Sequence, residues 1–160
     1  MQCKKSILQF SAALIMTILV AFPSMARAYD DSVALHGLDN AKVYFSLDTT
    51  TIDAERFPML LWGIVVTHDT LVAQGVTPDF IVGFSGSHVG WLTTNADPRV
   101  KGFIQQLAAL GIRTEVCYAA MNVFGVSPET ILPELEIVGN VWISQIAYQS
   151  KSKGYTRVDF

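Results

Sequence analysis

The stretch Pro78-Asp79-Phe80-Ile81-Val82-Gly83-Phe84 decides the fold class of this 160-residue chain. After its first two residues it is apolar throughout, without the alternation of a strand that has one face in water. Such a run is typical of a strand buried on both faces, as in a parallel sheet that is covered by helices. We therefore start from a parallel sheet with helices on both of its faces.

The segments on either side repeat the pattern of strand followed by helix. Strand character is found in 41–47, 111–116, 135–138 and 155–160 as well. Helices are predicted from Phe57 to about Gly75, over 97–110 and over 141–153, with a short helix or turn over 119–125 and a single helical turn at 127–129. Residues 29–40 are predicted to be an arm or loop, and 85–88 a turn. Five strands separated by helices indicate βαβ crossovers and an α/β fold, whereas the order of the strands stays open.

Residues 1–28 have the pattern of a secretory signal peptide. The basic pair Lys4-Lys5 precedes an apolar run over 7–22, and Ala26-Arg27-Ala28 is a small-x-small cleavage site. An uncleaved membrane anchor is the alternative, because the run approaches the length that spans a bilayer. We expect cleavage, a periplasmic or secreted protein, and a single domain over 29–160.

The charge of the chain excludes some classes of partner. Without residues 1–28 it would hold 8 basic and 14 acidic side chains, which gives a net charge of −6 against −3 for the whole sequence. Nucleic acid is therefore not expected as a partner, and neither is an anionic membrane surface after cleavage. Cys3 lies in the leader, so the single remaining cysteine, Cys117, excludes an internal disulfide framework.

Cys117 lies where the strand predicted over 111–116 runs into Tyr118-Ala119-Ala120. Ligand and catalytic groups collect at the carboxyl ends of strands in open α/β sheets, and a following helix N-terminus favours a thiolate. The residue is therefore a candidate nucleophile. Two alternatives stay open: a small apolar residue packed at a strand end, and an intermolecular disulfide.

The histidines and one polar loop are the other candidates. His88 follows the strand over 78–84 at the same edge of the sheet, and is either an acid or base beside the thiol or a solvated loop histidine. His68 lies on an apolar helical stripe and is interpreted as a core residue. No metal is expected, since the histidines and the cysteine lack the spacing of a zinc site. Asp48-Thr49-Thr50-Thr51 could receive a flavin phosphate or form a capped loop; without a glycine-rich fingerprint, no cofactor is expected.

Glu115-Val116-Cys117-Tyr118-Ala119-Ala120, followed by Gly125-Val126, resembles the cysteine segment of the DsrE family of small sulfur-trafficking proteins. The family includes DsrE/DsrF-like proteins and sulfur-relay subunits of the TusD type. Val138-Gly139-Asn140 and Trp142-Ile143 resemble its stand-alone members, and the likeness runs over about 41–160. Val123-Phe124 stand where TusD-like members carry basic residues.

This resemblance implies a three-layer α/β/α domain with a mainly parallel five-stranded sheet, assembled as a trimer or hexamer. It also implies that the cysteine matching Cys117 takes up sulfur as a persulfide and hands it between a donor and an acceptor protein. The first hypothesis is thus an exported sulfur carrier or sulfurtransferase-like protein. The second is an oligomeric binding or assembly module with a structural cysteine, and the third a small-ligand or flavin binder that uses residues 49–51.

Overall fold

The computed structural model describes residues 32–48 and 53–160. The signal peptide expected over 1–28 and the Thr49-Thr50-Thr51 loop lie outside these residues. Within them, no helix combines the length and the apolar character that crossing a membrane would require.

Five parallel strands form one sheet in the order β4-β3-β2-β1-β5. The strands are β1 (Asn40–Leu47), β2 (Thr77–Phe84), β3 (Arg113–Cys117), β4 (Glu136–Val138) and β5 (Thr156–Asp159). The predicted α/β class and all five predicted strands are confirmed. The apolar run that begins at Phe80 lies in β2, which has a strand on each side and is therefore central.

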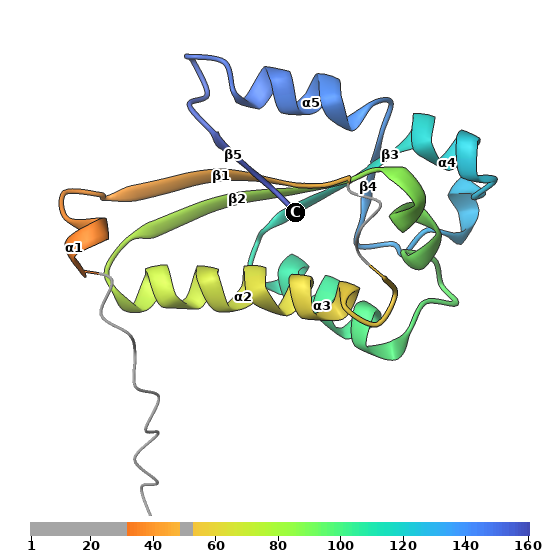
Figure 1. The fold of residues 1–160 in the computed structure, drawn as a ribbon, viewed down its shortest axis with the longest axis horizontal. Helices are drawn as coiled ribbons and strands as arrows, with labels where there is room; N and C mark the ends of the chain where they lie inside the picture. Colours follow the sequence, from red (N-terminus) through yellow and green to blue (C-terminus); the bar gives the residue numbers. More distant parts are fainter. Residues whose placement is uncertain (1–31, 49–52) are drawn as a thin grey trace, which may run out of the picture.

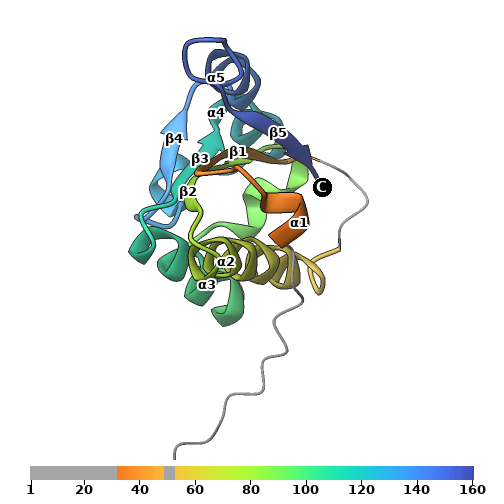
Figure 2. The same cartoon turned by 90° about the vertical axis from the view of Figure 1, so that its left-hand side faces the viewer.

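Helices cover both faces of the sheet (Figure 1). They are α1 (Ser32–Leu35), α2 (Phe57–Ala73), α3 (Pro98–Ala109), α4 (Tyr118–Phe124) and α5 (Val141–Tyr148), together with the 3-10 helices η1 (Gly86–Trp91) and η2 (Pro128–Thr130). Figure 2, viewed along the sheet, shows α2 and α3 on one face and α5 on the other. This is the expected three-layer arrangement, and α4 packs against η1 beyond the carboxyl ends of the central strands.

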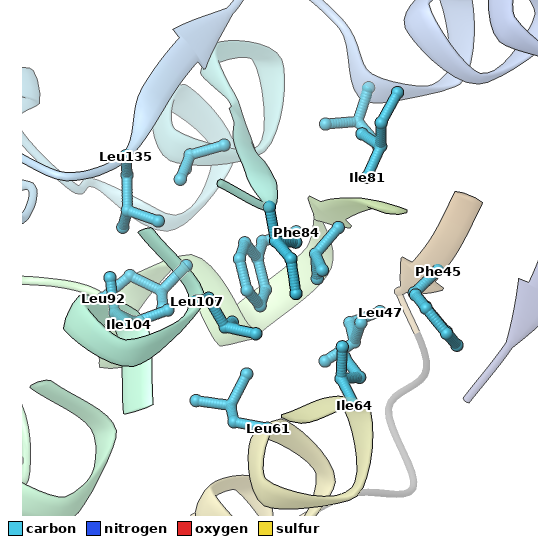
Figure 3. Close-up of a cluster of buried hydrophobic side chains, with 14 of the residues drawn as sticks. Phe45, Leu47, Leu61, Ile64, Ile81, Phe84, Leu92, Ile104, Leu107 and Leu135 are labelled. Atoms are coloured by element: carbon cyan, nitrogen blue, oxygen red, sulfur yellow. The ribbon is translucent and has the colours of Figure 1, made fainter. Parts of the chain in front are cut away.

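The main core lies between the sheet and the α2–α3 layer (Figure 3). Phe84 of β2 lies among side chains of the sheet and of both helices, including Leu47, Leu61, Ile64 and Leu107. Helix α3 begins as predicted, because the Asp97 carboxylate accepts a hydrogen bond of 2.7 Å from the backbone N–H of Arg99.

Three local predictions need correction. The helix predicted over 141–153 ends at Tyr148, since the polar residues after it offer no side chain to bury and the Ser150 hydroxyl donates to the carbonyl of Ala147. The predicted arm over 29–40 contains the short helix α1, and the turn predicted at 85–88 is the start of η1.

Candidate functional site

A cavity of about 300 Å³ opens at the carboxyl edge of the sheet. Four strands each bring one polar residue to it. Asp48 follows β1, Ser85 follows β2, Cys117 ends β3, and Asn140 follows β4 by two residues. Parallel strands end at the same edge, so residues far apart in the sequence meet there, as the sequence predicted for Cys117.

Cys117 is the free cysteine of the described chain, and it is buried with 5% of its surface exposed. Its backbone is extended (φ −75°, ψ 111°) and serves as the N-cap position of α4. Glu115, two residues earlier on β3, contacts α5, so the alternation of side chains along a strand turns Cys117 toward the same face. The thiol thus lines the cavity on the α5 side of the sheet while remaining shielded from bulk water.

The walls of the cavity are mostly apolar side chains from α4 and α5. They are Ala119, Ala120, Val123, Phe124 and Trp142. Val123, Phe124 and Trp142 are largely exposed at their outer sides, so they border the opening. The turn after β2 forms another part of the wall, where Gly86 has φ +66° and a Cβ would lie 3.3 Å from the Asp48 carbonyl oxygen. Glycine permits both the backbone angle and the close approach.

The polar groups of the cavity differ in how they are held. Asn140 caps α5 by accepting a hydrogen bond of 2.9 Å from the N–H of Trp142. Oδ2 of Asp48 lies 3.8 Å from Nη2 of Arg157 on β5. Ser85 lines the cavity and is only 5% exposed. Gly83, two residues earlier, faces Tyr44 and Val141, and this alternation turns the Ser85 side chain into the cavity.

A buried polar network lies next to the cavity on the same face. Glu115 is fully buried and accepts hydrogen bonds from Tyr44 Oη at 3.1 Å and from Ser144 Oγ at 2.5 Å. Nε of Arg113 lies 3.0 Å from Oε1 of Glu115, which makes the two side chains an ion pair. Oε1 accepts no well-aligned hydrogen bond from the described residues. Burial, followed by the Glu115 charge, raises the pKa of Tyr44 far above its ordinary value.

This buried network was not predicted from the sequence. Glu115 directly precedes the apolar pair Val116-Cys117 at the end of a predicted strand, and a carboxylate at this position was the available signal. Acidic residues are almost never fully buried unless they are paired, which would have predicted partners for Glu115.

His88 is fully buried and does not line the cavity. Its ring stacks on Phe57 at 5.6 Å between centroids and lies 5.0 Å from the ring of Trp91. Neither ring nitrogen has a well-aligned hydrogen bond within the described residues, although the nearby backbone of Leu47 and Ser85 favours the charged form. Burial outweighs this and lowers the pKa of His88. The solvated loop position is therefore wrong, and we assign His88 no role at the thiol.

The other histidines lie elsewhere. His68 on α2 is half-buried at the edge of the core: it packs edge-on against Phe80, and its Nδ1 lies 3.1 Å from Oδ1 of the exposed Asp69. His36 lies on the segment between α1 and β1. Across residues 32–48 and 53–160, no group of three or more His, Cys, Asp or Glu side chains is arranged to hold a metal ion.

Comparison with known proteins gives structural matches. No family model matches the sequence, and no curated protein matches it at a significant level. The structure is similar to a protein of unknown function, MTH1491 from Methanobacterium thermoautotrophicum, with a TM-score of 0.59, 19% identity, and coverage of 74% of this chain and 99% of that one. It is also similar to the YchN protein from E. coli, with a TM-score of 0.55, 12% identity, and coverage of 75% and 99%. These likenesses support the DsrE-like fold, and at such identities they show the fold alone.

Proposed function

We propose that the protein carries sulfur on Cys117 as a persulfide. The observation that supports this function is the position of the thiol: it lines a cavity at the carboxyl edge of a parallel sheet and is almost wholly shielded from bulk water. A cavity of about 300 Å³ admits a small molecule or the tip of a partner's side chain. A persulfide formed there would be protected from reaction with bulk thiols and oxidants.

The chemistry is a thiol exchange without net oxidation. For a persulfide donor R–S–S–H, the Cys117 thiolate attacks the outer sulfur, a new S–S bond forms on Cys117, and the S–S bond of the donor breaks. The electron pair of that bond leaves on the inner sulfur, which takes up the proton that Cys117 released. The products are R–SH and a Cys117 persulfide, and an acceptor thiol removes the outer sulfur by the same reaction.

The test is sulfur uptake by the full chain, with peptide mass spectrometry to separate Cys117 from Cys3. The protein is incubated with thiosulfate and, separately, with an organic trisulfide plus a small thiol. We expect Cys117 to gain one sulfur atom from at least one donor, and Cys117→Ser to gain none at that peptide. A Cys117 that stays unmodified with both donors, while the urea-unfolded chain is modified, would overturn the function and leave a packing cysteine.

Export and assembly stay predictions. The exposed apolar side chains of α5, Trp142, Ile143 and Ile146, support assembly into an oligomer, since contiguous apolar patches mark interaction surfaces. Light scattering of the purified protein measures its mass, and N-terminal sequencing of protein from a native host shows whether residues 1–28 are removed. We expect a trimer or hexamer that begins near Tyr29.

A further inference from the structure

The charge of the residues that line the cavity around Cys117 limits which substrates it can accept. Among the described lining residues, five side chains are apolar and the one formally charged residue is Asp48. No Lys or Arg is found among the lining residues that the structure describes. An anion that enters therefore meets a carboxylate and no Lys or Arg side chain among the described lining residues, and the partial positive charge of the α4 N-terminus at Cys117 opposes this carboxylate only in part.

The nearest cation does not remove this negative field. Arg157 lies 3.8 Å from Asp48, and it also pairs with Asp159 on its own strand. One guanidinium is thus shared by two carboxylates, which leaves one negative charge in excess beside the cavity. The Asp48 side chain is only 23% exposed, so water screens its charge less than at an open surface.

The polar atoms that remain suit an uncharged ligand. Ser85 is nine-tenths buried, and its hydroxyl can donate one hydrogen bond and accept others. The amide oxygen of Asn140 is already occupied by the N–H of Trp142. One hydroxyl, the amide N–H groups of Asn140 and apolar walls favour a mainly apolar body with a few polar atoms, and the volume of about 300 Å³ limits that body to a small molecule.

We infer that the cavity selects a small, uncharged, mainly apolar organic polysulfane or disulfide, and disfavours thiosulfate and inorganic polysulfide anions. This inference rests on the proposed function, of which it names the donor class. For an organic trisulfide R–S–S–S–R, the Cys117 thiolate attacks the central sulfur and R–S⁻ leaves and is protonated. A second small thiol R′–SH then attacks the sulfur that bears R, R–S–S–R′ leaves, and the persulfide stays on Cys117.

The selectivity can be measured with two disulfide reagents of different charge. Dithiodipyridine is neutral and dithiobis(nitrobenzoate) is a dianion; each forms a mixed disulfide with Cys117 and releases a product that absorbs light, a pyridinethione from the first and a nitrothiobenzoate from the second. The rates are measured on full-length protein carrying Cys3→Ser, folded at low salt and unfolded in urea. We expect the ratio of neutral to anionic rates to be about tenfold higher in the folded protein, which corresponds to about 1.4 kcal/mol.

Matched variants locate the selectivity. Asp48→Asn should raise the rate of the anionic reagent about three- to tenfold at low salt, and added salt should reduce this gain. Asp39→Asn, an exposed acid at the amino end of β1, should change nothing. Trp142→Ala should lower the rate of the neutral reagent, whereas Trp62→Ala, an equally exposed indole on α2, should not.

Equal ratios in the folded and unfolded protein, or an equal effect of Asp39→Asn and Asp48→Asn, would overturn the inferred donor class. That failure is distinct from failure of the proposed function. If Cys117 discriminates between the reagents but never retains a sulfur atom, only the proposed sulfur carriage is overturned. If Cys117 takes sulfur equally from thiosulfate and the organic trisulfide, only the inferred donor class is overturned.

Discussion

Ser144 on α5 donates a hydrogen bond of 2.5 Å to Glu115, a fully buried carboxylate two residues before Cys117 on the same face of β3. The same carboxylate oxygen accepts from Tyr44 of β1. One acidic side chain therefore joins two strands and the helix that follows Asn140. Because β3 and the start of α5 form two sides of the cavity, this link fixes their separation.

Removing Glu115 should destabilise the fold. Glu115→Ala leaves the Tyr44 and Ser144 hydroxyls without their buried acceptor, and should lower the free energy of unfolding by about 2–4 kcal/mol, because each buried donor left unsatisfied costs about 1–3 kcal/mol. Glu115→Gln keeps an acceptor oxygen and should cost about 1–2 kcal/mol. Urea denaturation measures both. The exposed Glu55→Gln should stay within about 0.5 kcal/mol of the wild type, and an equal effect at both positions would contradict the role of the network.

Gly83 should not tolerate a methyl group. A Cβ at this position would lie 2.3 Å from Tyr44 Oη and 2.8 Å from Val141 Cγ1. We expect Gly83→Ala to lower the free energy of unfolding by about 1–3 kcal/mol, the range for overpacking a core.

Two further variants make the Gly83 prediction specific. Tyr44→Phe combined with Gly83→Ala should cost less than the sum of the single changes, because the closest atom is then absent. Gly102 lies at an exposed position of α3, where a Cβ would meet no atom within 4 Å. Gly102→Ala should therefore raise the free energy of unfolding by up to about 1 kcal/mol. Thermal or urea unfolding measures the stability of each variant. A Gly83→Ala protein more stable than the wild type would refute the packing argument.

Stability should fall as the pH drops below the ordinary pKa of histidine. Burial lowers the pKa of His88, so the folded state keeps the ring neutral while the unfolded state binds a proton below about pH 6.5. The stabilisation is thus present above the unfolded pKa and is lost as the pH falls below it. The Asp48 charge opposes the shift only in part.

His88→Leu should flatten this pH dependence in the window that opens below about pH 6.5, where the unfolded state binds the proton that the folded state excludes. His36→Gln, an exposed histidine, should leave it unchanged. Urea midpoints measured across that window test the prediction. A wild-type slope that persists in His88→Leu would assign the titration to another group.

The Asp97 carboxylate should stabilise α3 only above acidic pH. The side chain of Arg99, followed by its backbone N–H, holds the pKa of Asp97 at about 2. The contribution of the charge is therefore full above the unfolded pKa of about 3.9 and disappears as the pH falls through about 2.

Asp97→Asn retains an acceptor for the helix cap but not the charge. We expect the wild type to have the higher urea midpoint at pH 7 and the two midpoints to converge as the pH falls through about 2, where the carboxyl group becomes protonated. A constant difference across this range would show that the charge has no part in it.

The sequence alone determined the class of the fold and the edge of the sheet at which Cys117 lies. The apolar run of β2, the helix start at Asp97 and the strand that ends at Cys117 are local patterns, and the structure confirms each of them. They could be predicted because the spacing of apolar residues along a segment indicates whether it forms a strand or a helix and which of its faces is buried. In a parallel sheet, the end of a strand then fixes the edge at which its last residue lies.

Only the tertiary structure decided the strand order and the surroundings of the thiol. Pairing of β1 with β5 brings Arg157 to Asp48, and the packing of α5 on β3 brings Ser144 to Glu115. The stacking of His88 on Phe57 likewise joins η1 to α2. Each contact depends on which faces of distant segments meet, and local periodicity carries no information on that, so the charge and shape of the cavity emerge only when the chain is folded.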